Sequence, residues 1–227
     1  MKEFRLEYRN SKIRILCDKN LKNQATEELK KNYNELERYI QRDPFFLTSY
    51  EPVSLLDNAP RIARIMANAS KRASVGPMAS VAGAFSEIIG DFLLRNGAEE
   101  VVVENGGDIF LRLRSEKTVG IYAGDSAFSE RIGFRIMPEE TPLAICTSSG
   151  SVGHSVSFGD SDSVTVVAES CSLADSAATS VGNSVKGENA IEKGIKRAKK
   201  IQGIDGILII RGDELGSYGK IPEIIEV

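Results

Sequence analysis

Asp175 and Thr179 are the two residues of this sequence whose types and spacing most directly indicate chemistry. Residues four apart share one face of a helix, so a carboxylate and a hydroxyl would point to one place. Such a sparse set of oxygen ligands suits Mg²⁺ when phosphate groups and water complete its coordination. A structural interpretation competes with this one, in which Ser172 is the N-cap of the helix and Asp175 is its capping-box-like partner. On spacing alone, the capping interpretation is favoured.

A second candidate is the turn that lies between two apolar segments and consists of Asn105, Gly106, Gly107 and Asp108. Two glycines permit positive φ angles, and without side chains they let backbone N–H groups approach a phosphate. The alternative is an ordinary hairpin turn, in which the Gly-Asp pair supplies the geometry. Taken by itself, the pattern favours the turn.

Small residues recur every three or four positions along one predicted helix, at Ala79, Gly83, Ser86 and Gly90. Either another helix or a flat ligand must approach such a face closely. We favour packing against the helix that carries Ala174 and Ala178, which has a matching small face. Glu87 and Asp91, four residues apart, are most simply a solvated edge of the first helix.

A segment rich in serine and glycine follows a predicted strand and includes Ser148, Ser149 and Gly150. Its N–H groups and hydroxyls could bind an anion. His154 is the only histidine of the chain and is a candidate catalytic residue, although a single loop histidine is more often incidental. A histidine-built zinc or di-iron site is excluded, and the absence of a GxSxG motif argues against a serine hydrolase.

The composition is that of a single globular domain of 227 residues, with 41% hydrophobic residues and a net charge of −3. This charge gives no basic surface for nucleic acid. The charged N-terminus does not fit a signal peptide, and acidic residues interrupt the longest apolar stretch. Three dispersed cysteines fit reduced thiols, so we expect a cytoplasmic protein without nucleic-acid or membrane partners.

The elements that must position the candidate residues alternate between helix and strand. Residues 1–75 contain none of the 20 glycines and predict a hairpin over 4–17, with its turn at Asn10-Ser11, then helices over 22–41 and 60–72. Residues 76–213 form the expected pocket-bearing core, with helices over 77–96 and 173–200, the latter broken near Gly187. Its predicted strands are 100–104, 109–113, 118–123, 131–136, 143–147, 163–169 and 206–211. Residues 214–227 are expected to be a tail.

Two parts of this core resemble each other. Each has a helix rich in small residues, then an apolar strand and a Gly-Asp turn, once at Gly107-Asp108 and once at Gly212-Asp213. An internal duplication of helix–strand units is one interpretation. The small helix faces and the strand edges are also compatible with a homodimer.

Five motifs in a fixed order are more specific together than any one of them alone. They are PMASVAGA at 77–84, NGGDI at 105–109, TSSG at 147–150, SVTVVA at 163–168 and ADSAAT at 174–179. Together they resemble the ApbE-like superfamily, whose best-known members are FAD:protein FMN transferases. The resemblance covers residues 76–213, and more narrowly the chain resembles the short, cytosolic ApbE-like proteins of archaea and bacteria. It implies an α+β fold with an internal duplication, preceded here by the N-terminal hairpin and helices.

The resemblance also implies roles for individual residues. Asp175 and Thr179 would bind Mg²⁺ together with a backbone carbonyl near Ala79, and the ion would bridge the diphosphate of FAD or a related flavin. Asp175 and His154 are the expected catalytic residues. The flavin pocket would be lined by Gly83, Asn105, Gly106, Gly107, Asp108, Ser148, Ser149 and Gly150.

The interval 151–162 departs from the family pattern. Transferases of the family carry a histidine and a D-P-x-T-G segment there, whereas this chain has His154 but neither Asp-Pro nor Thr-Gly. The first interpretation is a Mg²⁺-dependent enzyme that acts on a flavin nucleotide by transfer or by hydrolysis. A second, which this departure favours, is an enzyme of cofactor biosynthesis that binds a pterin-like or other flat heterocycle in the same pocket. A third is a non-catalytic binding or assembly protein that has kept the fold.

Overall fold

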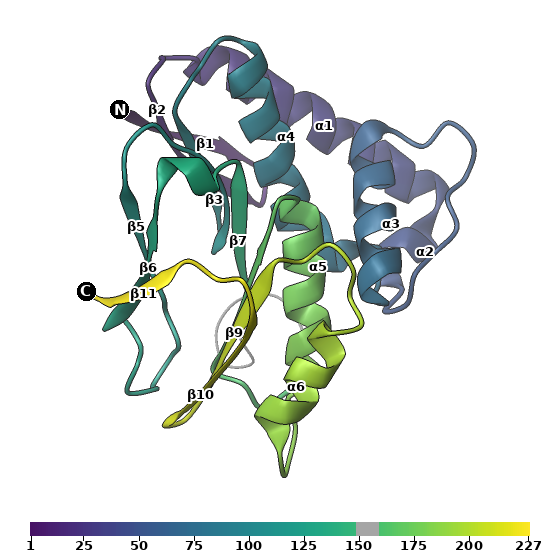
Figure 1. Ribbon diagram of the computed structural model, residues 1–227. Helices are drawn as coiled ribbons and strands as arrows, with labels where there is room; N and C mark the ends of the chain where they lie inside the picture. The colour runs from purple at the N-terminus through teal and green to yellow at the C-terminus, as the bar shows by residue number, and fades with distance from the viewer. Residues whose placement is uncertain (149–158) are drawn as a thin grey trace.

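The computed structural model describes residues 1–148 and 159–227 (Figure 1). In this part of the chain, an eight-stranded sheet runs through the middle of the molecule, and each strand is antiparallel to its neighbours. In spatial order its strands are β1 (Lys2–Tyr8), β2 (Ser11–Cys17), β3 (Val101–Asn105), β4 (Asp108–Arg112), β7 (Leu143–Ser148), β8 (Ser163–Ala168), β9 (Gly206–Arg211) and β10 (Glu214–Gly219).

A smaller sheet and a layer of helices cover the two faces of this sheet (Figure 1). The small sheet has the order β11 (Glu223–Glu226), β6 (Ile132–Ile136) and β5 (Lys117–Gly120). The helices are α1 (Lys22–Arg42), α2 (Pro44–Thr48), α3 (Arg61–Ala73), α4 (Val81–Arg95), α5 (Cys171–Gly182) and α6 (Ala190–Ala198). Two 3₁₀ turns, η1 (Pro77–Ser80) and η2 (Pro138–Glu140), complete the described elements. The expected α+β fold is therefore confirmed.

Strand alternation divides the apolar side chains between two cores, one on each face of the large sheet. Val103, Phe110 and Cys146 face the helices, whereas Leu111 and Ile145 face the small sheet. The same alternation places the side chain of Asp108, two residues before Phe110, on the helix face. The candidate residues of β4 and β7 are thus turned toward α4 and α5.

The N-terminal prediction holds, with small shifts. The hairpin pairs Tyr8 with Ser11, so its turn residues are Arg9 and Asn10 rather than the predicted Asn10-Ser11. Asp43-Pro44 ends α1 as expected, but Pro44 also begins α2, which the sequence interpretation missed. Proline is well suited to the first turn of a helix because it has no N–H to leave unbonded there.

The two central helices begin differently from the prediction. Pro77 opens the 3₁₀ turn η1, and α4 proper begins only at Val81. The predicted break near Gly187 is confirmed, because α5 ends at Gly182 and α6 begins at Ala190, but α5 already begins at Cys171 rather than at 173. Each of the two similar parts of the core is nevertheless a helical segment followed by an antiparallel hairpin of the same sheet, β3–β4 or β9–β10.

The prediction that Gly206–Arg211 is the last strand is wrong, because residues 214–227 contain β10 and β11. Most side chains of β10 are exposed, so no apolar alternation marks this strand in the sequence. Backbone pairing with β9 holds it in place instead, from Glu214 opposite Arg211 to Gly219 opposite Gly206. The predicted strand over 118–123 is also shorter and earlier, as β5.

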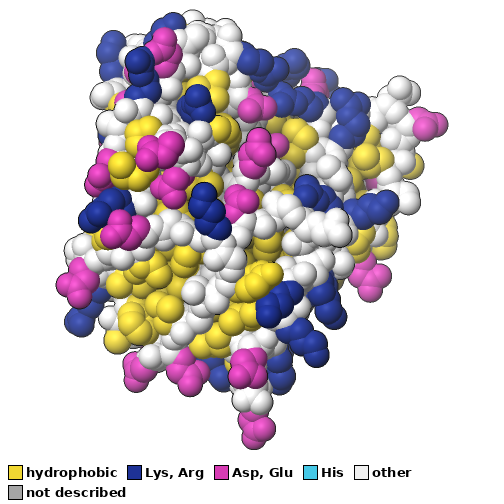
Figure 2. Space-filling model, viewed as in Figure 1, with side chains coloured by type: hydrophobic (Ala, Val, Ile, Leu, Met, Phe, Trp, Pro, Cys, Tyr) yellow, Lys and Arg dark blue, Asp and Glu magenta, His cyan; other side chains and the backbone are white. Residues whose placement is uncertain are grey.

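One described segment, Pro77–Arg95, has the length and the mean hydropathy of 1.3 that a membrane-spanning helix would need, and 56% of its most apolar window is buried inside the protein. Such burial is usual for a core helix. On the face shown in Figure 2, acidic and basic side chains are interspersed over helices and strands, without a continuous basic region.

Candidate functional site

The turn between β3 and β4 has the geometry that its glycines permit. Asn105 pairs with Asp108, and Gly106 and Gly107 have φ angles of 65° and 101°. A side chain added at Gly106 would meet nothing within 4 Å, so the backbone there can be approached closely. The hairpin and ligand interpretations are therefore compatible.

Two hydrogen bonds tie this hairpin to α4. The side-chain amide of Asn105 donates to the backbone carbonyl of Ala82 over 3.2 Å. The hydroxyl of Ser86, one turn further along α4, donates to the backbone carbonyl of Asp108 over 2.9 Å. The start of α4 and the glycine turn thus form one structural unit.

Asp175 reaches the same place from α5. Its Oδ2 accepts a hydrogen bond from the backbone N–H of Gly83 over 2.9 Å, and the N–H of Ala82 also donates to this carboxylate. The expected capping role is wrong in its details, because Ser170, not Ser172, is the N-cap of α5. Asp175 instead satisfies N–H groups in the first turn of α4, the neighbouring helix.

The small residues of α4 allow this approach. A Cβ added at Gly83 would lie 2.4 Å from the carbonyl oxygen of Cys171 and 2.8 Å from the Cβ of Asp175. A Cβ at Gly90 would lie 2.2 Å from the ring of Phe110. The structure therefore places Gly83 in the contact between α4 and α5, which agrees with the packing interpretation of the small face.

The predicted carbonyl ligand, that of Ala79, lies in η1 and outside α4. In a continuous α-helix the N–H of Gly83 would donate to this carbonyl, four residues earlier. Here it donates to Asp175. η1 also packs against α5, the helix that carries Asp175 and Thr179. The three predicted ligand residues therefore lie on two elements that contact each other.

Burial raises the pKa of Asp175 from 3.8 to about 7, although the N–H groups of Gly83 and Ala82 lower it. Burial, and then the charge of Asp175, raise the pKa of Asp108 well above its ordinary value, against hydrogen bonds from the Cys146 thiol and the Thr147 N–H. Asp108 is 6% exposed, and its Oδ1 has no hydrogen-bond partner among the described residues. Two neighbouring carboxyl groups are thus held where their negative charges are poorly solvated.

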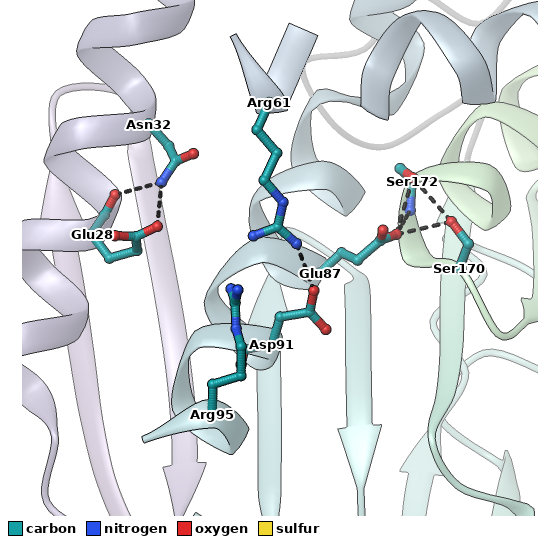
Figure 3. A network of polar contacts seen from close by, with 8 residues as sticks. All are labelled: Glu28, Asn32, Arg61, Glu87, Asp91, Arg95, Ser170 and Ser172. Atoms are coloured by element: carbon teal, nitrogen blue, oxygen red, sulfur yellow. Dashed lines mark hydrogen bonds and ion pairs between the residues drawn. The ribbon is translucent and has the colours of Figure 1, made fainter. Parts of the chain in front are cut away.

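The sequence interpretation missed Glu87, which it placed on a solvated edge. One oxygen of Glu87 accepts bonds from the Ser170 hydroxyl over 2.9 Å and from the N–H and hydroxyl of Ser172 over 3.0 Å each (Figure 3). Asp91, one turn later, forms an ion pair with Arg61 over 2.7 Å instead. Glu87 lies four residues after Gly83, so the helical spacing already placed it on the face that meets α5.

The carboxylates of α4 and α5 therefore bind each other's helix starts. Glu87 of α4 binds the first turn of α5, and Asp175 of α5 binds the first turn of α4. This reciprocal arrangement fixes the position of Asp175 relative to η1 and to the glycine turn.

The remaining predicted residues are less fully placed. Thr179 is partly buried on α5, one turn after Asp175, and Ser148 is buried at the end of β7, paired with Val164. Ser149, Gly150 and His154 lie outside the described residues. Two hollows in the described part of the chain lie elsewhere, one beside Asp205 and Lys220, the other beside Arg112 and Pro142.

Sequence comparison relates this chain to a family and to individual proteins. A family model described as "AbpE bacteria" matches residues 1–203. The UPF0280 protein of Methanococcus maripaludis strain C7 is 51% identical over 195 residues, which cover 84% of this chain and 79% of that protein. The UPF0280 protein MJ1526 of Methanocaldococcus jannaschii is 46% identical over 215 residues, covering 92% and 86%.

Solved structures of low sequence identity share the fold. The flavinyl transferase ApbE of Pseudomonas stutzeri in its apo form has a TM-score of 0.65 and 13% identity, covering 96% of this chain and 94% of that one. The flavin transferase ApbE of Vibrio cholerae has a TM-score of 0.60 and 15% identity, with 96% of each chain covered. This chain therefore belongs to the family of the "AbpE bacteria" model, with UPF0280 proteins among its relatives, and has the fold of the ApbE flavin transferases.

Proposed function

We propose that this protein is a Mg²⁺-dependent enzyme that binds a flavin nucleotide such as FAD and acts on its diphosphate, by transfer or by hydrolysis. The observation that carries the proposal is the position of Asp175, whose carboxylate is bound by the Gly83 N–H at the start of α4 and lies next to Asp108. The shared fold with proteins named as flavin transferases supports the choice of ligand.

The donor set fits Mg²⁺. Carboxylate, carbonyl and hydroxyl oxygens are the ligands that this ion takes from proteins, usually with water and phosphate oxygens completing the shell. Asp175, Thr179 and the Ala79 carbonyl would hold it. A divalent cation would also offset the repulsion between Asp175 and Asp108 that raises the pKa of Asp108. When bound, Mg²⁺ would neutralise charge on the diphosphate.

The residues of the chain supply the remaining parts of the proposed site. The Gly83 N–H orients the carboxylate of Asp175, and Asn105 holds the glycine turn against the Ala82 carbonyl. The backbone of Gly106 and Gly107 is free of side chains where a phosphate or a flat ring could approach. His154, as the chain's single histidine, remains the proposed residue for proton transfer or ligand contact.

The test is thermal unfolding of the purified protein with FAD and Mg²⁺, separately and together. We expect a rise in Tm that needs both and that disappears in the Asp175→Ala variant. Arg61→Ala serves as a matched control, because Arg61 pairs with Asp91 at the exposed edge of α4. No change of Tm with FAD, FMN or riboflavin in the presence of Mg²⁺ would exclude a flavin as the ligand.

A second candidate function is the binding of a pterin-like or other flat heterocycle. It is favoured by the interval 151–162, which lacks both Asp-Pro and Thr-Gly. Mass spectrometry of small molecules that co-purify with the native protein distinguishes the two candidates. A recovered flavin supports the first function, and a recovered heterocycle of another class supports the second.

Cytoplasmic location and a homodimer remain proposals that fractionation and light scattering would test.

A further inference from the structure

Two cysteines from distant parts of the sequence meet beneath the proposed site. Cys146 lies on β7, and Cys171 is the first residue of α5. Their sulfur atoms are 3.5 Å apart, and both side chains are 0% exposed. A disulfide has a sulfur–sulfur distance of about 2.0 Å, so rotation of the side chains with a small backbone shift would suffice to join them.

We propose that Cys146 and Cys171 are a disulfide-forming pair, a covalent modification site that joins the N-terminus of α5 to β7. The third cysteine, Cys17, provides a contrast within the same chain. It lies on β2, and its sulfur contacts Asp18 and Lys19 instead of another thiol. The geometry therefore selects one of the three possible pairings. This inference concerns the described core and does not depend on the proposed flavin function.

The pair is expected to stay reduced in the folded protein unless an oxidant reaches it. Burial raises the pKa of Cys171 to about 11, against a lowering effect of the hydrogen bond with the Cys146 thiol and with smaller upward contributions from the charges of Asp108, Asp175 and Glu87. Burial also raises the pKa of Cys146. Because the thiolate is the reacting form, oxidation at neutral pH should be slow and should require transient opening of this region.

The reaction balances with an azo oxidant such as diamide. One cysteine sulfur, as thiolate, adds to one nitrogen of the N=N bond, and the other nitrogen of that bond takes up a proton. The second thiolate then attacks the first sulfur, forming the S–S bond and displacing the nitrogen, which is protonated. The two thiols together lose two hydrogens, and the azo compound becomes a hydrazine.

The cross-link would affect the contact on which the site depends. The carbonyl of Cys171 faces Gly83, so the position of Cys171 sets how closely α4 and α5 approach each other. Closing the chain between residues 146 and 171 would also restrict the unfolded state. The oxidised protein should therefore unfold at a Tm higher by roughly 5–10 °C than the reduced protein.

The experiment treats the reduced, full-length protein with diamide below its thermal midpoint, then unfolds it and alkylates the remaining thiols. We expect one alkylated cysteine, Cys17, in place of three, and a non-reducing peptide map that joins the peptides of Cys146 and Cys171. A reducing agent should restore three alkylated thiols and the lower Tm. The same treatment in denaturant provides the control, and it should give mixed pairings that include Cys17.

Two variants make the result decisive. Cys17→Ala should retain the cross-link, and Cys146→Ala should leave two alkylated thiols. The peptide map of the unmodified sequence gives the answer even if a variant fails to fold. Three alkylated thiols after treatment of the folded protein, or the same mixture of pairings as in denaturant, would overturn the proposal.

Discussion

At the scale of single residues, Asp175 has two roles that oppose each other. It binds the N–H groups at the start of α4, which favours its charged form, and it is partly buried beside Asp108, which disfavours it. Burial has the larger effect, and the pKa of Asp175 rises from 3.8 to about 7. A carboxyl group held in this state gains most from a cation, and this is the physical reason for placing the metal there.

The raised pKa predicts how stability depends on pH. Between about pH 4 and about pH 7, the folded protein holds a proton on Asp175 that the unfolded chain has lost. The free energy of unfolding must therefore fall as pH rises through this window, and above it the full cost of the buried charge is present. Urea denaturation at a series of pH values should show this slope in metal-free protein.

Asp175→Asn should make the slope shallower. The amide oxygen can still accept the Gly83 N–H, and the remaining slope should come from Asp108, whose pKa is raised as well. Added Mg²⁺ should stabilise the unmodified protein more above pH 7 than below it, because the carboxylate must be charged to bind the ion. An identical slope in the variant would show that Asp175 is not the group that titrates.

At the scale of elements, the close contact between α4 and α5 depends on Gly83, which has no side chain. Gly83→Ala would place a Cβ 2.4 Å from the Cys171 carbonyl, so the helices must separate, and we expect a loss of about 1–3 kcal/mol in the free energy of unfolding. Gly120→Ala is the matched control, because a Cβ there meets nothing within 4 Å. Denaturant titration of both variants makes the comparison, and equal losses would contradict the close-contact argument.

The first turn of α5 depends on Glu87. Glu87→Ala removes the acceptor of three hydrogen bonds and leaves donors of Ser170 and Ser172 without their partner. We expect a loss of about 1–3 kcal/mol by denaturant titration, and a smaller loss in Glu87→Gln, which keeps an acceptor oxygen. Asp91→Asn, at the exposed ion pair with Arg61, should cost less than about 1 kcal/mol. If Asp91→Asn cost as much as Glu87→Ala, the assigned network would be wrong.

The elements that the sequence predicts well are those with buried periodic side chains. β8 is buried along its whole length, and Leu29 and Leu36, two turns apart on α1, are buried in the core, so apolar pattern and position agree. β10 could not be found this way, because most of its side chains are exposed and its pairing with the β9 backbone leaves no apolar alternation in the sequence. The spacing of Asp175 and Thr179 also predicts correctly that they are one turn apart on a helix.

The hydrogen-bond partners of these side chains could not be predicted from the sequence, because they lie on other elements. Ser172 followed by Asp175 looked like a local cap, yet Asp175 binds the start of α4 and Glu87 binds Ser172. Local spacing is the same in both arrangements, and only the packing of α4 against α5 decides between them. The meeting of Cys146 with Cys171 has the same origin in tertiary structure.

At the scale of the whole molecule, residues 1–75 are part of the structure that supports the site, not an appendage. β2 pairs with β3 from Arg14 opposite Glu104 to Cys17 opposite Val101, which continues the central sheet. The backbone carbonyl of Ala73, at the end of α3, accepts the hydroxyl of Ser180 on α5 over 2.6 Å and also accepts from Arg197 on α6. The N-terminal section therefore contacts both the strand before the glycine turn and the helix that carries Asp175.

This arrangement predicts that the full chain unfolds as one unit and that the core alone does not fold. Circular dichroism and tyrosine fluorescence should report the same urea transition for the full chain. A fragment of residues 76–227 would expose the edge of β3 and the α5 surface that α3 covers, so it should show no cooperative transition. Residues 76–213 contain every residue proposed for the site. The fragment therefore tests whether those residues form the site without the N-terminal elements that contact them. A fragment that unfolds cooperatively and is still stabilised by FAD with Mg²⁺ would show that the core supports the site by itself.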